Sequence, residues 1–439
     1  MFGTSGVRGP FGGLITPELA MSLGHALAAT GLDRVVVGHD ARTTSPLLAD
    51  SASSALRSAG VDTVRAGQVS TPALARGVEF TDSDAGLMIT ASHNPPEDNG
   101  FKLWEPSGQA FGEARRAEVE AALNALEPAY ASWDAIGAEE SAEQLTAQHV
   151  DALCDAVDID GSCSVVVDLG NGMGNATVEA LLRLGCEVQT LNATPDGRFP
   201  GRPSEPTAAT CATLCSVVAN TDADLGIAHD GDADRMMAVD ETGSFVGGDE
   251  LLALFAREVV SDGERAAAPL NTSLVVDDVL EAQGGSLTRT KVGDVYVAEA
   301  ALDDDVVFGG EPSGAWIWPD EALCPDGPLA ACKLVELVEQ RGSLAAQRAT
   351  LASYPLRRTT VETDQKAEIM ARVRDAVRQT YDSERISTLD GVRIEYDDGW
   401  ALVRASGTQP LVRLTAEARD ERRVDELVEE VRQLVDDAR

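Results

Sequence analysis

Three aspartates stand at alternate positions in the stretch HDGDADRM, residues 229–236. They follow an apolar segment with the composition of a strand, so a tight loop after that strand turns Asp230, Asp232 and Asp234 towards one point. Carboxylate oxygens are the ligands that a hard cation such as Mg²⁺ prefers, and the spacing therefore predicts a Mg²⁺ site. An EF-hand loop does not fit, because its glycine and its bidentate glutamate are missing at the required spacing. A phosphatase loop of the DxDx[TV] type also competes, but its fifth position is here Asp234, which is a further ligand. A solvent-exposed acidic loop remains as the alternative.

A serine follows a second apolar segment. The run Leu87–Ile89 leads into TASHNPP, residues 90–96, where two prolines stiffen the chain after Ser92 and His93. His93 is a poor base for Ser92, because the side chains of adjacent residues diverge, and a Ser-His-Asp triad is therefore disfavoured. A serine turn or cap remains the alternative to a functional serine.

An internal repeat relates these two loops. Three segments begin with an acidic residue, continue as an apolar strand and end in a polar loop: DAGLMITAS at 84–92, DADLGIAHD at 222–230 and, more loosely, DDDVVFGGE at 303–311. Their ninth positions are Ser92, Asp230 and Glu311. Because equivalent strand ends line one cleft, we expect Ser92 beside the Mg²⁺ site, where a serine hydroxyl is a candidate carrier of a phosphoryl group.

The elements around these repeats predict four domains. Val-rich segments, each interpreted as a buried strand that enters a polar loop and then a helix, lie at 34–45, 163–175 and 272–282. Gly-led strands follow at 60–72, 185–195 and 284–294. This alternation predicts three similar α/β units with mixed or parallel sheets, whereas the remainder reads as an α+β unit with an antiparallel sheet and a final amphipathic helix. The expected domains are 1–150, 151–249, 250–353 and 354–439.

Cationic residues are scarce, so those in loops are informative. The chain has 73 acidic and 35 basic residues, a net charge of −38, and only four lysines. A Gly-rich loop, GTSGVRG at 3–9, offers Thr4, Ser5 and Arg8 to a phosphate, and Lys102 lies just downstream of Ser92. A second such loop and its neighbour offer Arg404, Ser406, Gly407, Thr408 and Arg413. In GGEPSG, Glu311 and Ser313 can bind sugar hydroxyls. Each loop alone is also typical of a plain turn.

The acidic surface limits the partners. It repels nucleic acid and anionic membranes, and it is typical of the solvated acidic faces of halophilic proteins. The first residues, MFGTSGVRG, show no signal-peptide pattern, and no apolar run is long enough to span a bilayer, so we expect a cytoplasmic protein.

Five motifs in order along the whole chain resemble those of the α-D-phosphohexomutase superfamily, which includes phosphoglucomutase, phosphomannomutase and phosphoglucosamine mutase. They are GTSGVRG, TASHNP, DGDADR, GEPSG and RASGTQP. The resemblance implies three topologically similar α/β domains with mixed sheets, plus a C-terminal α+β domain of the TATA-binding-protein-like type, around a central cleft.

The resemblance also implies roles for individual residues. Ser92 is expected to be a phosphoserine, with Mg²⁺ held by Asp230, Asp232, Asp234 and a phosphoserine oxygen. Arg8, Lys102 and Arg235 match positions that steer the phosphoryl group or act in proton transfer. Glu311 and Ser313 match the sugar-hydroxyl loop, and the loop at 404–410 matches the site for the phosphate that is not transferred.

The resemblance implies a mutase that interconverts hexose 6-phosphate and hexose 1-phosphate through a hexose 1,6-bisphosphate. The segment KVGDVYV at 291–297, which contains Gly293, resembles the VGDRYV of phosphoglucosamine mutases and favours glucosamine phosphate. Gln409 stands where the family commonly has glutamate, and Ala315 stands where a histidine often follows the sugar loop. The alternatives are a phosphomannomutase/phosphoglucomutase, a phosphoserine-type sugar phosphatase and a sugar-phosphate or Mg²⁺ sensor. We expect a monomer or homodimer.

Overall fold

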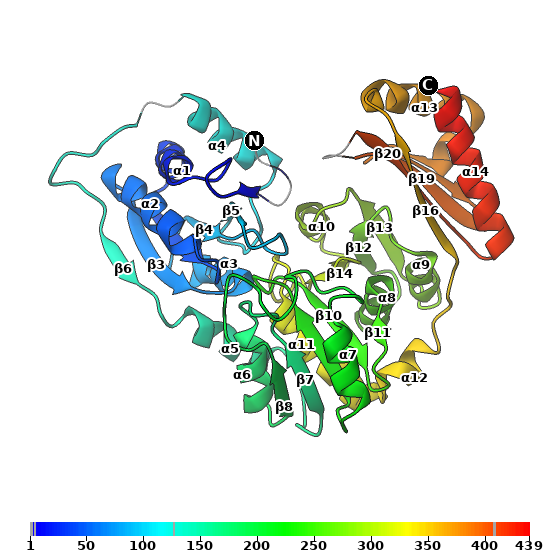
Figure 1. The fold of residues 1–439 in the computed structure, drawn as a ribbon, viewed down its shortest axis with the longest axis horizontal. Helices are drawn as coiled ribbons and strands as arrows, with labels where there is room; N and C mark the ends of the chain where they lie inside the picture. Colours follow the sequence, from blue (N-terminus) through cyan, green and yellow to red (C-terminus); the bar gives the residue numbers. More distant parts are fainter. Residues whose placement is uncertain (1–2, 4–5, 126–127, 407–409) are drawn as a thin grey trace.

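The computed structural model describes residues 3, 6–125, 128–406 and 410–439. Within these residues the chain forms four β-sheets, each covered by helices, in four consecutive domains (Figure 1). None of the helices in this described part is long and apolar enough to cross a membrane.

Domain I is built on a mixed sheet with the strand order β1-β5-β4-β2-β3-β6. Its strands are β1 Val7–Pro10, β2 Arg34–His39, β3 Asp62–Gln68, β4 Ala85–Ile89, β5 Asp98–Trp104 and β6 Glu139–Ser141. Its helices are α1 Pro17–Ala29, α2 Ser45–Ser58, α3 Thr71–Phe80 and α4 Glu113–Ala125. Strand β4 runs parallel to β2 and antiparallel to β5, and its residues are all buried.

Domain II repeats this arrangement in the strand order β11-β10-β9-β7-β8. Its elements are α5 Leu145–Asp155, β7 Ser164–Asp168, α6 Asn175–Arg183, β8 Glu187–Leu191, α7 Ala212–Ala219, β9 Leu225–His229, β10 Met236–Asp240 and β11 Phe245–Val246. Here β9 runs parallel to β7 and antiparallel to β10.

Domain III has the strand order β13-β12-β14-β15, with β14 parallel to β12 and antiparallel to β15. Its strands are β12 Arg265–Pro269, β13 Ser286–Thr290, β14 Val306–Glu311 and β15 Ala315–Ile317. Its helices are α8 Gly248–Val259, α9 Leu274–Glu281, α10 Asp294–Ala300, α11 Gly327–Arg341 and α12 Leu344–Arg348.

The predicted strand at 272–282 is wrong, because this segment forms α9. The side chain of Ser273 caps the helix, and Val275, Val276 and Leu280 form its buried face. The strand of this unit is instead the Ala-rich β12. A short apolar run does not distinguish a strand from a buried helix by periodicity alone.

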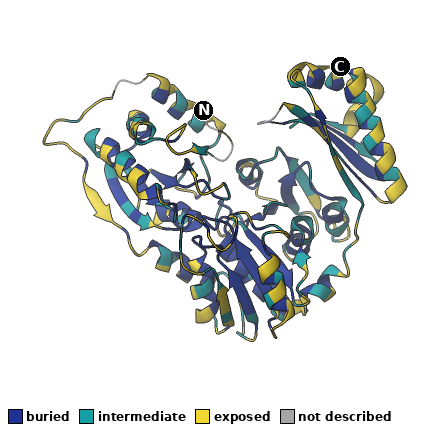
Figure 2. Ribbon diagram, viewed as in Figure 1, coloured by how far each residue is buried: buried dark blue, intermediate teal, exposed yellow. Residues whose placement is uncertain are grey.

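Domain IV has the strand order β16-β20-β19-β18-β17, with every neighbouring pair antiparallel. Its elements are β16 Leu356–Glu362, α13 Lys366–Thr380, η1 Ser383–Arg385, β17 Ile386–Ser387, β18 Val392–Tyr396, β19 Gly399–Ala405, β20 Leu411–Ala418 and α14 Glu421–Asp437. Figure 2 shows the long C-terminal helix α14 with buried positions towards the sheet and exposed positions on its outer side, as its amphipathic sequence predicts.

The repeat in the sequence is a repeat in the structure. In domains I, II and III, the strands β4, β9 and β14 run parallel to β2, β7 and β12, respectively. Each then leads through a loop into an antiparallel strand, which is β5, β10 or β15. Ser92 and Asp230 follow β4 and β9, and Glu311 ends β14. The three functional candidates therefore occupy equivalent strand ends.

Candidate active site

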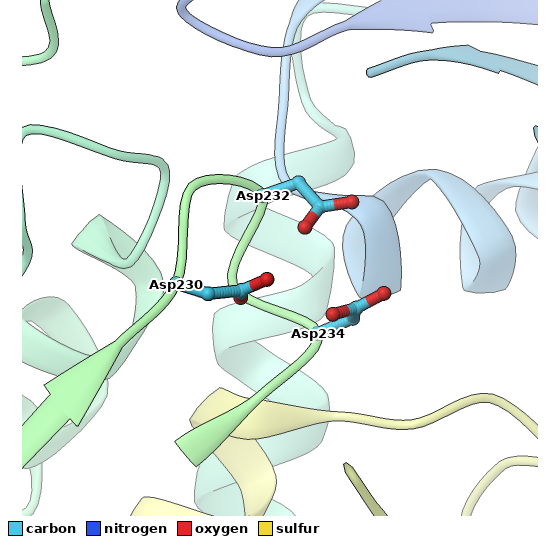
Figure 3. Close-up of side chains that lie close together, drawn as sticks. All are labelled: Asp230, Asp232 and Asp234. Carbon is cyan, nitrogen blue, oxygen red and sulfur yellow. The ribbon is translucent and has the colours of Figure 1, made fainter. Parts of the chain in front are cut away.

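The loop between β9 and β10 gathers the three aspartates. One carboxylate oxygen of each lies within 4.8 Å of those of the other two, and all three residues are buried. Figure 3 shows the side chains projecting from one loop towards a shared space. Ala233, between Asp232 and Asp234, has a φ of 59°, a left-handed conformation that tightens the loop.

Ser92 meets this loop from the other domain. Its Oγ donates a hydrogen bond of 2.7 Å to Oδ2 of Asp230. Ser92 has a φ of 50°, in the left-handed region that a serine seldom occupies. Gly231 passes so close that a Cβ there would lie 2.7 Å from the carbonyl oxygen of Ser92. The backbone of the aspartate loop therefore packs directly against the backbone of the Ser92 loop, with no room for a side chain at Gly231.

Lys102 and Thr71 hold the outer oxygens of two aspartates. Lys102 Nζ lies 2.8 Å from Oδ2 of Asp232 and 2.5 Å from Oδ2 of Asp234, and Thr71 Oγ1 donates to the same oxygen of Asp232 at 2.6 Å. Among the described residues, Oδ1 of Asp232 and Oδ1 of Asp234 are buried and have no hydrogen-bond partner. Buried carboxylate oxygens without partners are costly, and hard oxygen donors suit Mg²⁺, so these residues fit a divalent cation.

Burial and neighbouring charges shift the protonation of these groups. Burial, together with the charges of Asp234 and Asp232, raises the pKa of Asp230 well above its usual value. Burial would also raise the pKa of Asp232, but Lys102 and the hydroxyl of Thr71 hold it far below the usual range. Burial disfavours the charged form of Lys102, yet Asp232 and Asp234 raise its pKa, so the ammonium stays charged.

His93 is neutral in this setting. Burial, and then the positive charges of Arg235 and Arg8, lower its pKa to about 2. Its Nδ1 is buried without a hydrogen-bond partner among the described residues. A ring with so low a pKa is a weak base, in agreement with the expectation that Ser92 does not rely on its neighbour. Arg8 lies on β1, opposite Gly100 in β5, and therefore enters the site from the edge of domain I.

Domain III contributes the third strand end. Oε1 of Glu311 accepts a hydrogen bond of 2.7 Å from the backbone N–H of Gly293, and Oε2 accepts one of 3.1 Å from Ser313. Arg235 and Ala315 form an isolated backbone bridge, which holds the loop of Glu311 and Ser313 beside the aspartate loop. The structure thus brings Gly293, Glu311 and Ser313 together.

Domain IV carries a pair of arginines. Arg404 on β19 lies directly opposite Arg413 on β20, and such like charges repel unless an anion or an acidic side chain lies between them. Arg404 forms an ion pair of 3.0 Å with Asp390, whereas Arg413 is exposed and makes no ion pair with the described residues. The backbone carbonyl of Ser406 accepts a hydrogen bond of 2.5 Å from Lys366. Thr4, Ser5, Gly407 and Thr408 lie outside the described residues.

Several contributors had no signal in the sequence. Thr71 begins a helix in domain I yet contacts an aspartate of domain II. Lys366 begins α13, 40 residues before Ser406, yet donates to its carbonyl oxygen. Asp294, which follows Gly293, is half-buried, and burial and the charge of Asp234 raise its pKa. The only sign of Asp294 in the sequence was its place in the segment KVGDVYV.

A cavity of about 840 Å³ opens beside the Ser92 loop. It is lined by His93–Pro96 on one side and by Arg198–Glu205 of domain II on the other. Glu205, at the end of this lining, forms an ion pair with Arg235, whose Nη1 lies 3.9 Å from its Oε1. The cavity therefore lies next to a residue of the aspartate loop.

This fold and this site define an enzyme of the α-D-phosphohexomutase superfamily, an isomerase that moves a phosphoryl group on a hexose phosphate. Four sequence profiles described as phosphoglucomutase/phosphomannomutase domains I, II, III and C-terminal match residues 1–129, 144–243, 247–354 and 356–434. The chain therefore belongs to the phosphoglucomutase/phosphomannomutase family.

Similar proteins align with this chain over nearly its full length. A protein of Methanopyrus kandleri named "probable phosphoglucosamine mutase" is 46% identical over 451 aligned residues, covering 100% of this chain and 99% of the relative. One of the same name from Methanocella arvoryzae is 44% identical, covering 99% and 98%. The crystal structure of a phosphoglucomutase/phosphomannomutase family protein from Burkholderia thailandensis has a TM-score of 0.89 at 26% identity, covering 100% and 98%.

Proposed function

We propose that this enzyme interconverts glucosamine 6-phosphate and glucosamine 1-phosphate, with Ser92 as the phosphoryl carrier. Two features support glucosamine: relatives over the whole chain carry the name phosphoglucosamine mutase, and the segment at 291–297 resembles that of such enzymes. The observation that carries the role of Ser92 is its hydrogen bond of 2.7 Å to Asp230 across two domains. A hydroxyl that only caps its own loop would not reach the acidic cluster of another domain.

The first half of the reaction moves a phosphoryl group from Ser92 to the sugar. The bond from phosphorus to Ser92 Oγ breaks while a bond to the free sugar hydroxyl oxygen forms, and the proton of that hydroxyl ends on Ser92 Oγ. The products are hexose 1,6-bisphosphate and the unmodified serine. Phosphoryl transfer requires mostly alignment and charge neutralisation, and Lys102 and Arg8 supply positive charge from domain I.

The second half restores the phosphoserine. The bisphosphate turns end for end, and its other phosphoryl group passes to Ser92 Oγ, whose proton returns to the oxygen that the group leaves. In the serine form, the Ser92 hydroxyl proton points at Oδ2 of Asp230, so the lone pairs of Oγ are available for the incoming phosphorus. Glu311 and Ser313 bind sugar hydroxyls in both orientations, because the pyranose presents hydroxyls on either side.

Asp230, Asp232, Asp234 and a phosphoserine oxygen would hold Mg²⁺, which neutralises the charge of the transferring group when it is bound. The protein contributes burial of the three carboxylates and the fixed position of Lys102, which contacts Oδ2 of Asp232 and Oδ2 of Asp234. Removal of divalent ions by a chelator should abolish turnover, and Mg²⁺ should restore it.

The Arg404 and Arg413 pair fits the phosphate that is not transferred. A dianion between the two guanidinium groups would relieve their repulsion and compete with Asp390 for Arg404. Closure of domain IV on that phosphate would exclude water while the bisphosphate turns, since water would otherwise accept the phosphoryl group.

The decisive experiment compares kcat/KM for the 6-phosphates of glucosamine, glucose and mannose, with Mg²⁺ and the matching 1,6-bisphosphate present. We expect glucosamine 6-phosphate to be preferred. A preference for mannose or glucose phosphate would contradict the proposed substrate and favour the phosphomannomutase/phosphoglucomutase alternative.

A second measurement tests the carrier. Intact mass and peptide mapping after incubation with the bisphosphate should place one phosphate on Ser92, and a phosphate assay should detect almost no release to water. Stoichiometric release of inorganic phosphate would instead identify a phosphatase.

A further inference from the structure

Arg42 is a fully buried arginine that contacts the backbone of the Ser92 loop. Its Nη2 donates to the carbonyl oxygens of Ser92 and Asn94, each at 2.7 Å. Its Nη1 donates to the carbonyl oxygens of Pro95 and Asp98, at 2.6 and 2.9 Å. The guanidinium thus binds four carbonyls of one short segment.

Asp40, which directly follows β2, holds this arginine and is linked through Thr90 to the N–H of Ser92. Its Oδ2 lies 3.1 Å from Nε of Arg42 and accepts a hydrogen bond of 2.7 Å from Oγ1 of Thr90. Oγ1 of Thr90 in turn accepts the backbone N–H of Ser92 at 2.8 Å. Both polar groups of the Ser92 peptide backbone therefore lead back to the Asp40–Arg42 pair, one through Arg42 and one through Thr90.

A pair of this kind is an expensive way to stabilise a fold. Burying an ion pair costs desolvation that its attraction often fails to repay, so apolar packing would serve stability equally well. What apolar packing cannot do is hold a residue at a φ of 50° by its own N–H and C=O. These contacts hold both the N–H and the C=O of Ser92 and the loop that follows it, which indicates that placement of Ser92 is what they provide.

Domain II contains a matching pair behind the other partner. Asp168, at the end of β7, binds Nε of Arg202 at 2.7 Å, and Nη2 of Arg202 donates at 2.6 Å to the carbonyl oxygen of His229, the residue before Asp230. Ser204, close to Arg202 in sequence, donates at 3.0 Å to the carbonyl oxygen of Ser92. Asp40 directly follows β2 and Asp168 ends the equivalent strand β7, so each repeat fixes its own half of the contact between Ser92 and Asp230.

We propose that the Asp40–Arg42 pair, acting through Thr90 and the loop carbonyls, is a positioning device that aims Ser92 Oγ at the aspartate cluster and keeps its phosphoryl group from water. This inference rests on the proposed role of Ser92 as phosphoryl carrier. Neither Asp40 nor Arg42 touches the reacting atoms, so both act through the geometry of Ser92.

Thr90→Val tests this device without removing a buried charge. It keeps the shape of the side chain but cannot accept from Ser92 N–H or donate to Asp40. We expect kcat to fall about 10-fold or more, since small misplacements of reacting groups are costly, while KM changes little. The fraction of phosphoryl groups lost to water per turnover should rise. Thr90→Ser keeps the hydroxyl and should restore kcat to near the original value.

Two further variants separate positioning from stability. Arg42→Lys keeps the charge but cannot span the four carbonyls, and we expect a loss of kcat of about 100-fold. Thr63→Val is the matched control: Thr63 is buried in the same sheet, and its hydroxyl has no partner among the described residues, so kcat should not change. Melting temperatures and the fraction of Ser92 that carries phosphate are measured for every variant, and kcat is expressed per phosphorylated enzyme.

Unchanged kcat and phosphoryl retention in Thr90→Val would overturn the inference, as would losses that follow melting temperature alone and appear equally in Thr63→Val. The proposed function is judged separately, on the unaltered enzyme and on Ser92→Ala. A failure of the positioning role therefore shows as a Thr90→Val enzyme that still carries phosphate on Ser92 and turns over normally.

Discussion

The contact between domains I and II and the contact between domains III and IV both contain buried polar contacts, beside a small apolar cluster of Leu270, Trp400 and Leu402 in the second, but the polar contacts differ in what they join. Between domains I and II, the hydrogen bond of Ser92 to Asp230 and the ion pairs of Lys102 with Asp232 and Asp234 run through the proposed reacting groups themselves. All five residues are buried.

Between domains III and IV, one contact reaches the partner of a residue proposed to bind phosphate, because the N–H of Val292 donates at 3.4 Å to Oδ2 of Asp390, which pairs with Arg404. The contacts of Glu417 and Arg393 involve none of the residues proposed to bind phosphate. Glu417 accepts from the hydroxyl of Ser273 at 2.6 Å and from the N–H of Leu274 at 2.7 Å, at the start of α9. Arg393 donates to the carbonyl oxygen of Leu270, and its burial, with the nearby charge of Arg289, lowers its pKa to about 10. Figure 1 shows the sheet of domain IV set apart from that of domain I.

The difference suggests two kinds of junction. A change at the first junction displaces groups that react, so it should act on kcat. A change at the second junction alters the position of domain IV relative to domain III but leaves Arg404 itself in place. Such a change should therefore act on KM. For each of the following variants, the change in kcat is compared with the change in KM.

The largest effect is expected for Ser92→Ala at the first junction. Removal of the proposed phosphoryl carrier should lower kcat about 10⁴-fold or more, because no other hydroxyl occupies its position. The fold should persist, since only one hydrogen bond is lost. Steady-state kinetics and the melting temperature are the measurements, with Ser107→Ala, an exposed serine of the same domain, as the control. Retained full activity would contradict the role of Ser92.

Gly231→Ala should have the next largest effect. A Cβ at this position would lie 2.6 Å from Oγ of Ser204 and 2.7 Å from the carbonyl oxygen of Ser92, so the two loops must separate. We expect kcat to fall about 100-fold with a small change in KM. Gly13→Ala is the control, because the nearest atom to its Cβ would lie at 3.4 Å, an ordinary contact. If KM rises instead while kcat holds, the first junction does not act through the reacting groups.

Most of the site could be anticipated from the sequence because its loops occupy repeated strand ends. The spacing of Asp230, Asp232 and Asp234, and their alignment with Ser92, needed only local pattern and the repeat. The supports of these loops could not be anticipated. Arg42 lies 50 residues before Ser92 in sequence, and only the parallel pairing of β2 with β4, which places His39 beside Ile89, brings them together.

Two other features of the structure could not be predicted from the sequence, each for a physical reason. The strand expected at 272–282 is α9, because a serine cap and tertiary burial outweighed the β-propensity of its valines. The pairing of Arg404 with Asp390 depends on the turn before β18, whose position the spacing of residues does not reveal. Four-domain architecture follows from alternation of elements, whereas side-chain partners follow from packing.

At the second junction, Arg404→Ala should raise KM for the hexose phosphate about 10- to 100-fold, the value of one charged hydrogen-bonded contact, with a smaller change in kcat. Arg378→Ala, an exposed arginine on α13 of the same domain, should leave KM unchanged and controls for the loss of positive charge. A variant with normal KM and reduced kcat would place Arg404 among the reacting groups and remove the distinction between the junctions.

Glu417→Gln should have a smaller effect of the same kind. The amide oxygen can still accept from the N–H of Leu274 and from Trp400 Nε1, which both donate to Oε2, but the side chain loses its charge and its NH₂ group then faces the hydroxyl of Ser273, which now donates to Oε1. A shift in the position of domain IV relative to domain III should raise KM about 3- to 10-fold and leave kcat nearly unchanged. Glu426→Gln, an exposed glutamate on α14, is the control. A loss confined to kcat would contradict the assignment.

The smallest effect on activity is expected at a third polar junction, where Asp326 at the start of α11 meets Arg76 of α3 at 3.0 Å and His149 of α5 at 2.9 Å. Burial would raise the pKa of Asp326, but His149 and Arg76 hold it well below the usual range. A carboxyl with a depressed folded pKa adds stability that is present above its unfolded pKa of about 4 and is lost as the pH falls further. Asp326→Asn should therefore melt roughly 5 °C below the unaltered enzyme at neutral pH, with the gap in melting temperature narrowing below about pH 4.

Because Asp326 touches neither Ser92 nor Arg404, kcat and KM should stay within about 2-fold at temperatures where both proteins are folded. A gap in melting temperature that widens on acidification would reverse the sign of this linkage, and a selective change in kcat would show that this junction also positions the reacting groups.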